Sequence, residues 1–245
     1  MNRLQKCCAI VGAGEGLGAA LAARFARGGF DIGLVSRSEA GSAAAFAAAR
    51  SVRGETGVRF RQGDADRPET IERALAELAR EMGRFEILIY NVRGEFTGCA
   101  PLEMTTEALE AAFRIEVVGA FSAARAVLPA MRAQNRGTIF FSSATAAFRG
   151  SASHPLYSNS KFGLRALSQS LSKAYAADGV HIVHVRLDCD LDVPITRRLY
   201  GEAYHSAKLA DPEDVAETYW LIHQQPKGGW SNEIEIRPNT ETWTF

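Results

Sequence analysis

The feature that most constrains the fold of this sequence is a regular alternation of short apolar runs with longer amphipathic stretches. The strand-like runs are Lys6–Val11, Asp31–Ser36, Val58–Gln62, Phe85–Asn91, Thr138–Ser143, Val180–Leu187 and Ile234–Ile236. Helical patterns cover Leu17–Arg27, Ala43–Arg53, Glu69–Met82, Thr106–Arg132, Pro155–Ala177 and a stretch from Asp211 to about Gln224. Strands that alternate with helices form right-handed βαβ units and a parallel sheet. We therefore predict a single α/β domain over residues 1–245: a doubly wound, seven-stranded parallel sheet with helices on both faces.

The composition narrows the class of partner. Hydrophobic residues make up 47% of the 245 residues, enough for one sizeable core. The formal net charge is +0 and both signs are mixed along the chain, so we expect a small-molecule partner and no nucleic acid. No apolar run approaches the roughly 18 residues of a membrane span, and no signal-peptide pattern occurs. We expect a cytoplasmic protein that does not bind a membrane.

The cysteines do not have the spacing of a metal site. No Cys-x-x-Cys pair occurs among Cys7, Cys8, Cys99 and Cys189, and the five histidines are scattered. Adjacent Cys7 and Cys8 would point to opposite faces of a strand. We expect reduced thiols and no bound metal.

A glycine cluster follows the first strand and leads into the first helix. Its spacing is Gly-x-x-x-Gly-x-Gly, in which the glycines allow a tight turn, close approach of a pyrophosphate, and packing of helix on strand. The helix N-terminus would then present its dipole and free N–H groups to phosphates. The predicted phosphate-binding residues are Gly12, Gly14, Glu15, Gly16, Leu17 and Gly18.

The end of the second strand bears on the choice between NADP and NAD. It reads Ser36-Arg37, with no acidic residue to bind the ribose 2′-hydroxyl of NAD, and Arg37 offers a cation for the 2′-phosphate of NADP. A solvated arginine is the alternative, and the carboxylate of Glu15 opposes a phosphate. We predict NADP as cofactor, with NAD as the alternative. At the end of the third strand, Asp64 and Ala65 are placed to meet the adenine, while Asp66 could cap the next helix.

A second constellation lies in the C-terminal half. Tyr157 and Lys161 are four residues apart near the start of a helical pattern, so they share one face. A free phenol has a pKa of about 10, and a unit charge roughly 4 Å away would lower it by about three units. Ser143, at the end of the fifth strand, could hydrogen-bond a carbonyl oxygen that the tyrosine protonates. Together these residues predict carbonyl reduction with a nicotinamide cofactor.

In these motifs and their order, the chain resembles the short-chain dehydrogenase/reductase family over nearly its whole length. The resemblance implies a carbonyl reductase or secondary-alcohol dehydrogenase in which Ser143 polarises the carbonyl and Tyr157 is the acid–base. It implies that Lys161 binds the nicotinamide ribose and modulates Tyr157, and that Asn91 and Val92 contact the cofactor. It also implies a homodimer or homotetramer built on the two long helices.

The chain departs from the family pattern around the site. The family's Asn-Asn-Ala-Gly reads Tyr90-Asn91-Val92-Arg93, and its helix asparagine is Glu116. Val11, Asp188-Cys189 and Val193 replace its threonine, Pro-Gly and nicotinamide-side threonine. These changes motivate an alternative function, an NADP(H)-binding redox sensor or regulatory protein with little catalysis.

Glu116 itself has two interpretations, a catalytic relay residue or a buried structural carboxylate. Under either, we expect it within reach of Lys161.

The substrate side is less specific. The segment 192–205 is predicted to cover the substrate, and its arginines and tyrosines suit either an acidic or aromatic carbonyl compound or a solvated lid. Further candidate wall residues are Phe148, Arg149 and His154. Three aromatic residues near the chain end, Trp230, Trp243 and Phe245, could pack on the chain's own core or on a second subunit.

Overall fold

The fold is built on one parallel sheet. The computed structural model describes residues 6–54 and 57–240, and the structural statements below concern those residues. The strands are β1 Cys7–Val11, β2 Asp31–Ser36, β3 Val58–Gln62, β4 Phe85–Tyr90, β5 Gly137–Ala144, β6 Val180–Leu187 and β7 Glu233–Ile236. Their order is β3-β2-β1-β4-β5-β6-β7, and every neighbouring pair is parallel. This order confirms the predicted doubly wound sheet, with its topological switch between β1 and β4.

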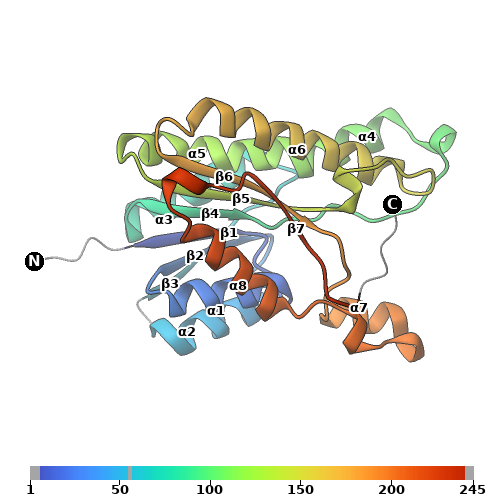
Figure 1. The fold of residues 1–245 in the computed structure, drawn as a ribbon, viewed down its shortest axis with the longest axis horizontal. Coiled ribbons are helices and arrows are strands. Elements are labelled where there is room, and N and C mark those ends of the chain that lie inside the picture. The colour runs from blue at the N-terminus through green and yellow to red at the C-terminus, as the bar shows by residue number, and fades with distance from the viewer. Residues whose placement is uncertain (1–5, 55–56, 241–245) are drawn as a thin grey trace, which may run out of the picture.

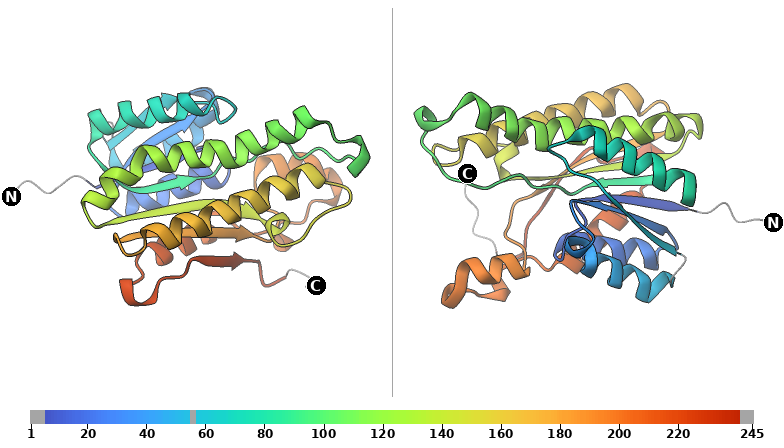
Figure 2. Two further views of the ribbon diagram at one scale, coloured as in Figure 1. Left: turned by 90° about the horizontal axis from the view of Figure 1, so that it is seen from above. Right: turned by 180° about the vertical axis from the view of Figure 1, so that it is seen from behind.

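Helices cover both faces of the sheet (Figure 1). They are α1 Leu17–Arg27, α2 Ala43–Arg53, α3 Pro68–Met82, α4 Thr106–Phe113, α5 Gly119–Ala133, α6 Pro155–Tyr175, α7 Pro194–Tyr200 and α8 Pro212–His223. One core lies between the sheet and α3, α5 and α6, and the other between the sheet and α1, α2 and α8. Both α4 and α7 lie beyond the carboxyl ends of the strands, on opposite sides (Figures 1 and 2). None of the helices in the described ranges has the length and apolarity needed to cross a bilayer.

The central strands are buried on both faces, which explains their continuous apolar sequence. All five residues of β1 are buried. Cys7 belongs to one core and Cys8 to the other, as the alternation of strand side chains predicts. Both are reduced thiols, and burial is the main cause that raises their pKa, to about 12 for Cys7. They are packing residues and poor nucleophiles.

One predicted element is wrong: the continuous helix Thr106–Arg132 is interrupted. Residues Arg114–Val118 form a π-helical turn between α4 and α5. The phenol of Tyr90, fully buried on β4, donates a hydrogen bond to the carbonyl oxygen of Ile115 in this turn. A Cβ at Gly119 would lie 2.4 Å from the same phenol oxygen, so the helix passes directly over it. The wide turn leaves a carbonyl free for Tyr90, a tertiary contact that helical periodicity does not reveal.

The chain end packs on the chain itself where it is described. The indole of Trp230 stacks on His181 with ring centroids 4.6 Å apart, and its N–H donates to the carbonyl oxygen of Gln225. Trp243 and Phe245 lie outside the described residues. The first of the two predicted packing alternatives therefore holds for Trp230.

Candidate active site

The glycine loop has the geometry of a phosphate cradle. Gly12 has a φ of +86°, and a Cβ there would lie 2.6 Å from the carbonyl oxygen of Asn91. A Cβ at Gly18 would lie 2.9 Å from the backbone of Ala13, so this glycine sets the packing of α1 on β1. No side chain caps α1 at Gly16, and its first turn holds no acidic residue. The N-terminal N–H groups of α1 are therefore available to an anion.

The loop after β4 is tied to the glycine loop. The backbone N–H of Asn91 donates a hydrogen bond to the carbonyl oxygen of Val11, at the end of β1, at 2.8 Å. Its side-chain amide donates to the carbonyl oxygen of Gly12 at 3.2 Å. Val92, the next predicted cofactor residue, is partly exposed beside it. The surviving family asparagine thus braces the cradle.

Ser36 and Arg37, at the end of β2, differ in how available their side chains are to a ligand. The hydroxyl of Ser36 bonds to the carbonyl oxygen of Ser38 and to the hydroxyl of Ser42, so it stabilises its own turn. The side chain of Arg37 is exposed. Glu15 faces Arg198 of α7 at 3.4 Å, which offsets the carboxylate beside the cradle.

Asp64 and Ala65 lie together at the end of β3. The carboxylate of Asp64 accepts a hydrogen bond from the backbone N–H of Asp66 at 3.1 Å. Ala65 is 8% exposed and contacts the region of Gly119. The alternative role of Asp66 as a helix cap is wrong, because the residue at the N-cap of α3 is Arg67.

The two serines at the end of β5 face opposite sides of the sheet. Ser142 bonds to the phenol of Tyr219 on α8 at 2.8 Å. Ser143 points the other way, toward the face that α6 covers, and is 4% exposed. Its hydroxyl has no hydrogen-bond partner among the described residues. A buried hydroxyl without a partner is costly unless a ligand completes it.

Helix α6 begins at Pro155 and carries Tyr157 in its first turn and Lys161 one turn later. The ammonium nitrogen of Lys161 lies 5.4 Å from the centroid of the Tyr157 ring. The structure therefore brings the phenol and the ammonium together on one helix face, as their spacing predicts.

Glu116 lies within reach of Lys161, as predicted. Its Oε2 accepts a hydrogen bond from Lys161 Nζ at 2.7 Å, and its Oε1 accepts from the backbone N–H of Gly94 at 2.8 Å. The side chains of Lys161 and Glu116 are 2% and 1% exposed. The carboxylate thus connects α6, the π-helical turn and the loop after β4.

The electrostatic balance at Tyr157 differs from the sequence prediction. Burial raises the pKa of Tyr157, and this effect is larger than the lowering by Lys161. The charge of Glu116 raises the same pKa, that of Arg93 lowers it, and that of Asp190 raises it. The net pKa of the phenol is above its ordinary value, whereas the lysine alone would lower it. Burial and the Glu116 carboxylate explain the difference.

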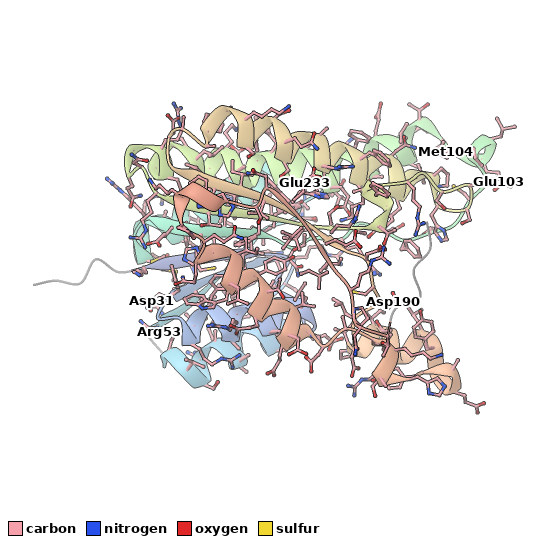
Figure 3. The ribbon with its side chains drawn as sticks, viewed as in Figure 1. Asp31, Arg53, Glu103, Met104, Asp190 and Glu233 are labelled. Carbon is pink, nitrogen blue, oxygen red and sulfur yellow. The ribbon has the colours of Figure 1, made fainter. Side chains whose placement is uncertain are left out.

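Asp188 and Asp190 follow β6, where Asp188-Cys189 stands in place of the Pro-Gly of the family pattern. The carboxylate of Asp188 accepts a hydrogen bond from the hydroxyl of Thr145 and forms an ion pair with Arg237. Asp190 lies between the sheet and α7 (Figure 3) and accepts a hydrogen bond from the phenol of Tyr200. The two aspartates therefore fix the start of the segment that was predicted to cover the substrate.

Two aromatic side chains form a wall beside Tyr157: His154, which was predicted, and Phe96, which was not. The ring of Phe96 packs edge-on to Tyr157 with centroids 5.0 Å apart. His154, a predicted wall residue, stacks on Phe96 at 4.1 Å and 8°. Phe96 was missed because it lies in the irregular segment between β4 and α4, where no periodic pattern places a side chain.

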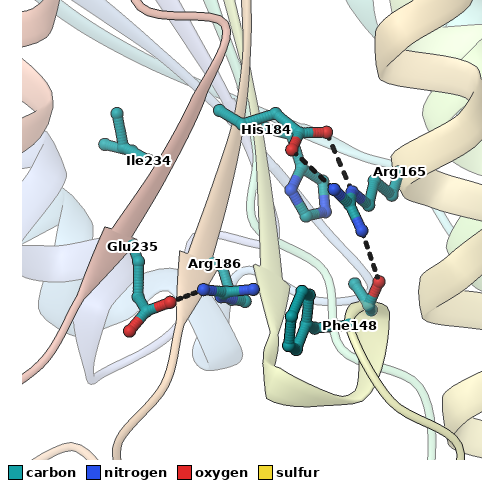
Figure 4. Close-up of a pocket in the computed structure, with 8 residues that line it drawn as sticks. Phe148, Arg165, His184, Arg186, Ile234 and Glu235 are labelled. Atoms are coloured by element: carbon teal, nitrogen blue, oxygen red, sulfur yellow. Dashed lines mark hydrogen bonds and ion pairs between the residues drawn. The ribbon is translucent and has the colours of Figure 1, made fainter.

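Phe148 lines a different pocket, so its predicted place in the substrate wall is not supported. This pocket, of about 300 Å³, lies between α6, β6 and β7 (Figure 4). Phe148 lies over the guanidinium of Arg186 there, at 4.6 Å. Arg165 pairs with Glu233, and Arg186 with Glu235, so the charges of the pocket wall compensate one another.

Known proteins of similar sequence and structure belong to the family that the motifs indicate. A family model described as short chain dehydrogenase matches residues 6–189. An uncharacterized oxidoreductase from Staphylococcus saprophyticus is 27% identical over 234 residues, covering 95% of this chain and 97% of that protein. The crystal structure of a short-chain dehydrogenase from Rhodopseudomonas palustris superposes with a TM-score of 0.80 at 28% identity, covering 95% and 98% of the two chains.

A metagenomic short-chain oxidoreductase, solved in complex with NADP, superposes with a TM-score of 0.81 at 22% identity, covering 96% of this chain and 97% of that chain. The sheet order, the glycine loop and the family match agree with one another. The chain belongs to the short-chain dehydrogenase/reductase family of oxidoreductases.

Proposed function

We propose that this protein is an NADP-preferring oxidoreductase that reduces a carbonyl compound or oxidises the corresponding secondary alcohol. The observation that carries the proposal is the buried hydroxyl of Ser143, which has no partner among the described residues and faces the side of the sheet covered by α6. Tyr157 and Lys161 are on the first two turns of that helix. A carbonyl oxygen could accept hydrogen bonds from the hydroxyls of both Ser143 and Tyr157.

The proposed mechanism assigns one task to each side chain. The hydroxyl of Ser143 donates a hydrogen bond that polarises the carbonyl, and the phenol of Tyr157 donates its proton to the carbonyl oxygen. The bound nicotinamide would supply the hydride to the carbonyl carbon. The raised pKa of Tyr157 keeps the phenol protonated at neutral pH, which is the form that donates the proton in the direction of reduction.

Lys161 and Glu116 support the phenol. The ammonium of Lys161 spends one donor on Glu116 and keeps two for the ribose hydroxyls of the nicotinamide nucleotide. Glu116 keeps this buried ammonium charged and in place, since the pairing raises the pKa of Lys161 against the effect of burial. We assign Glu116 a positioning role.

The cofactor proposal rests on the cradle. The glycine loop and the uncapped start of α1 would hold the pyrophosphate, and Asp64, Ala65, Asn91 and Val92 line the path of the nucleotide. Arg37 is an exposed cation at the end of β2, where a 2′-phosphate would bind. We expect Arg37→Ala to lower the preference for NADPH over NADH by about 10-fold, as measured by kcat/KM.

The decisive test compares wild type with Tyr157→Phe on a panel of carbonyl compounds, following NADPH oxidation. We expect turnover to fall by about 100- to 10,000-fold because the proton donor is lost, with NADPH binding retained. Tyr175→Phe, at the far end of the same helix, is the matched control and should behave as wild type. Tight NADPH binding without turnover in any of these proteins would favour the redox-sensor alternative.

We also propose a homodimer or homotetramer. Four large apolar side chains are exposed around α4, α5 and α6: Phe113, Val118, Phe121 and Phe162. An apolar surface of this kind suits contact with a second copy. Light scattering coupled to gel filtration tests it, and a monomer at micromolar concentration would contradict it.

A further inference from the structure

The loop after β4 places an unpaired cation beside the catalytic residues. Arg93 is exposed, and its guanidinium lies 5.9 Å from the centroid of the Phe96 ring. Within residues 6–54 and 57–240, no carboxylate forms an ion pair with it. Lys161, the other cation of the site, is 2% exposed and bonded to Glu116. Of these two cations, Arg93 is the one exposed to a ligand.

The backbone around Arg93 is fixed from both sides. Two residues before it, Asn91 bonds to the glycine loop, and directly after it, the N–H of Gly94 donates to Glu116 at 2.8 Å. These anchors hold Arg93 between the phosphate cradle and the π-helical turn. Its charge is close enough to Tyr157 and Lys161 to lower the pKa of both.

An aromatic wall separates the guanidinium from the phenol. Phe96 lies next to both, 5.0 Å from Tyr157 by ring centroids, and is stacked on His154. A ligand that spans from Tyr157 to Arg93 would therefore pass along an apolar surface between a proton donor and a cation. That arrangement suits a molecule with a carbonyl at one end and an anionic group at the other.

Resting on the function proposed above, we propose that Arg93 is a specificity residue that binds the carboxylate of an anionic carbonyl substrate. A guanidinium binds a carboxylate through two parallel hydrogen bonds, which fix the orientation of the substrate as well as its affinity. The two carboxylates whose charges act on Tyr157 are already engaged: Glu116 by Lys161 and Gly94, and Asp190 by Tyr200. The oxoacid class of substrate follows from this distribution of charge.

The experiment uses pairs of probes in which the methyl ester lacks the negative charge of the acid: pyruvate, levulinate and para-acetylbenzoate, each with its methyl ester. Reduction by NADPH is measured for wild type, Arg93→Met, Arg93→Lys and the control Arg73→Met, which removes an exposed charge on α3. We expect wild type to prefer at least one carboxylate over its ester. Arg93→Met should lower kcat/KM for that carboxylate by about 10- to 100-fold and leave its ester nearly unchanged. Arg93→Lys should be intermediate because it keeps the charge but loses the planar fork.

Two further measurements separate the other outcomes. A fluorescence titration of NADPH tests whether Arg93 instead binds a cofactor phosphate: weaker NADPH binding in Arg93→Met, with carboxylates and esters equally affected, would overturn the proposal. Isothermal titration calorimetry measures how tightly para-acetylbenzoate and its ester bind to NADP-loaded wild type and Arg93→Met. It compares acid with ester without depending on turnover. If no probe is reduced but the carboxylate binds through Arg93, the proposed reaction fails and the anion site stands. Equal binding of acid and ester overturns the anion site.

Discussion

Helix α6 carries two ion pairs, one turn apart, that look alike in distance and differ in environment. Lys161 Nζ lies 2.7 Å from Glu116, and the Arg165 guanidinium lies 2.8 Å from Glu233. The side chains of the first pair are 2% and 1% exposed, whereas those of the second are 29% and 36% exposed. Distance alone therefore says little about what a pair contributes, because desolvation and screening differ between the two sites.

The surroundings show why the first pair belongs to the site and the second does not. Lys161 and Glu116 are sealed between α6, the π-helical turn and the loop after β4, and Lys161 lies against the Tyr157 ring. Arg165 and Glu233 line a pocket whose other charges, Arg186 and Glu235, also pair with each other (Figure 4). The charges of Lys161 and Glu116 therefore act on the phenol of Tyr157. The charges that line the pocket only neutralise one another.

The largest effect we expect is on stability when the buried pair is broken. Glu116→Ala leaves the buried ammonium of Lys161 without its carboxylate partner, so the free energy of unfolding should fall by about 3–5 kcal/mol. Lys161→Ala should cost a similar amount for the same reason. Urea denaturation followed by circular dichroism measures both changes.

The matched double replacement sharpens this prediction. Glu116→Leu combined with Lys161→Met removes both charges and keeps apolar volume, so most of the lost stability should return while activity does not. Single variants that lose less than about 1 kcal/mol would show that the pair behaves like an exposed one, and the comparison between the two pairs would fail.

Sequence reasoning succeeded where chemistry follows from spacing. The glycine cluster predicted a tight turn at Gly12, and the structure gives that residue a positive φ. The four-residue spacing predicted that Tyr157 and Lys161 share a face. Glu116 was predicted near Lys161 because it stands at the position of the family's helix asparagine and could pair with the lysine as a relay residue or as a buried carboxylate. These features depend on local geometry or on the fold shared by the family, and each of the two can be inferred from the sequence.

Tertiary contacts explain what the sequence did not predict. The π-helical turn exists where Tyr90 reaches a carbonyl of another element, and no periodicity signals that contact. Phe96 reaches Tyr157 from an irregular loop. The raised pKa of Tyr157 depends on burial, which requires knowing how much of the phenol is covered. Each of these depends on packing between segments distant in sequence.

A second, smaller effect concerns pH and His184, a buried histidine of β6 that lines the same pocket as Arg165 and Glu233. Burial is the main cause that lowers the pKa of His184 to about 4, and its Nε2 is buried without a partner. An unfolded histidine has a pKa of about 6.5, so the unfolded chain takes up a proton that the folded chain refuses. Stability should therefore fall as the pH drops from about 6.5 toward 4, with roughly 2 kcal/mol lost at pH 5 from this residue.

His184→Gln isolates that contribution. It removes the titrating group and keeps a side chain able to hydrogen-bond, so the slope of unfolding free energy against pH between pH 4 and 6.5 should decrease. His223, whose pKa is also lowered to about 4, provides the internal comparison, and a part of the slope should remain with it. An unchanged slope in the variant would mean that His184 accepts a proton in the folded state.

The smallest effect should come from the exposed pair, and it is the sharpest check on the comparison. Hydrogen bonds from Arg165 and Gln169 lower the pKa of Glu233 to about 2. A lowered carboxylate pKa stabilises the fold above pH 4.5 or so, and this contribution is lost as the pH falls toward 2. Because the carboxylate is partly exposed, we discount it for solvent screening and expect Glu233→Gln to cost less than about 1 kcal/mol at pH 7. The cost should shrink further in 1 M salt, where screening is strong, whereas the cost of Glu116→Ala should not. If Glu233→Gln costs as much as Glu116→Ala and ignores salt, burial is not what separates the two pairs.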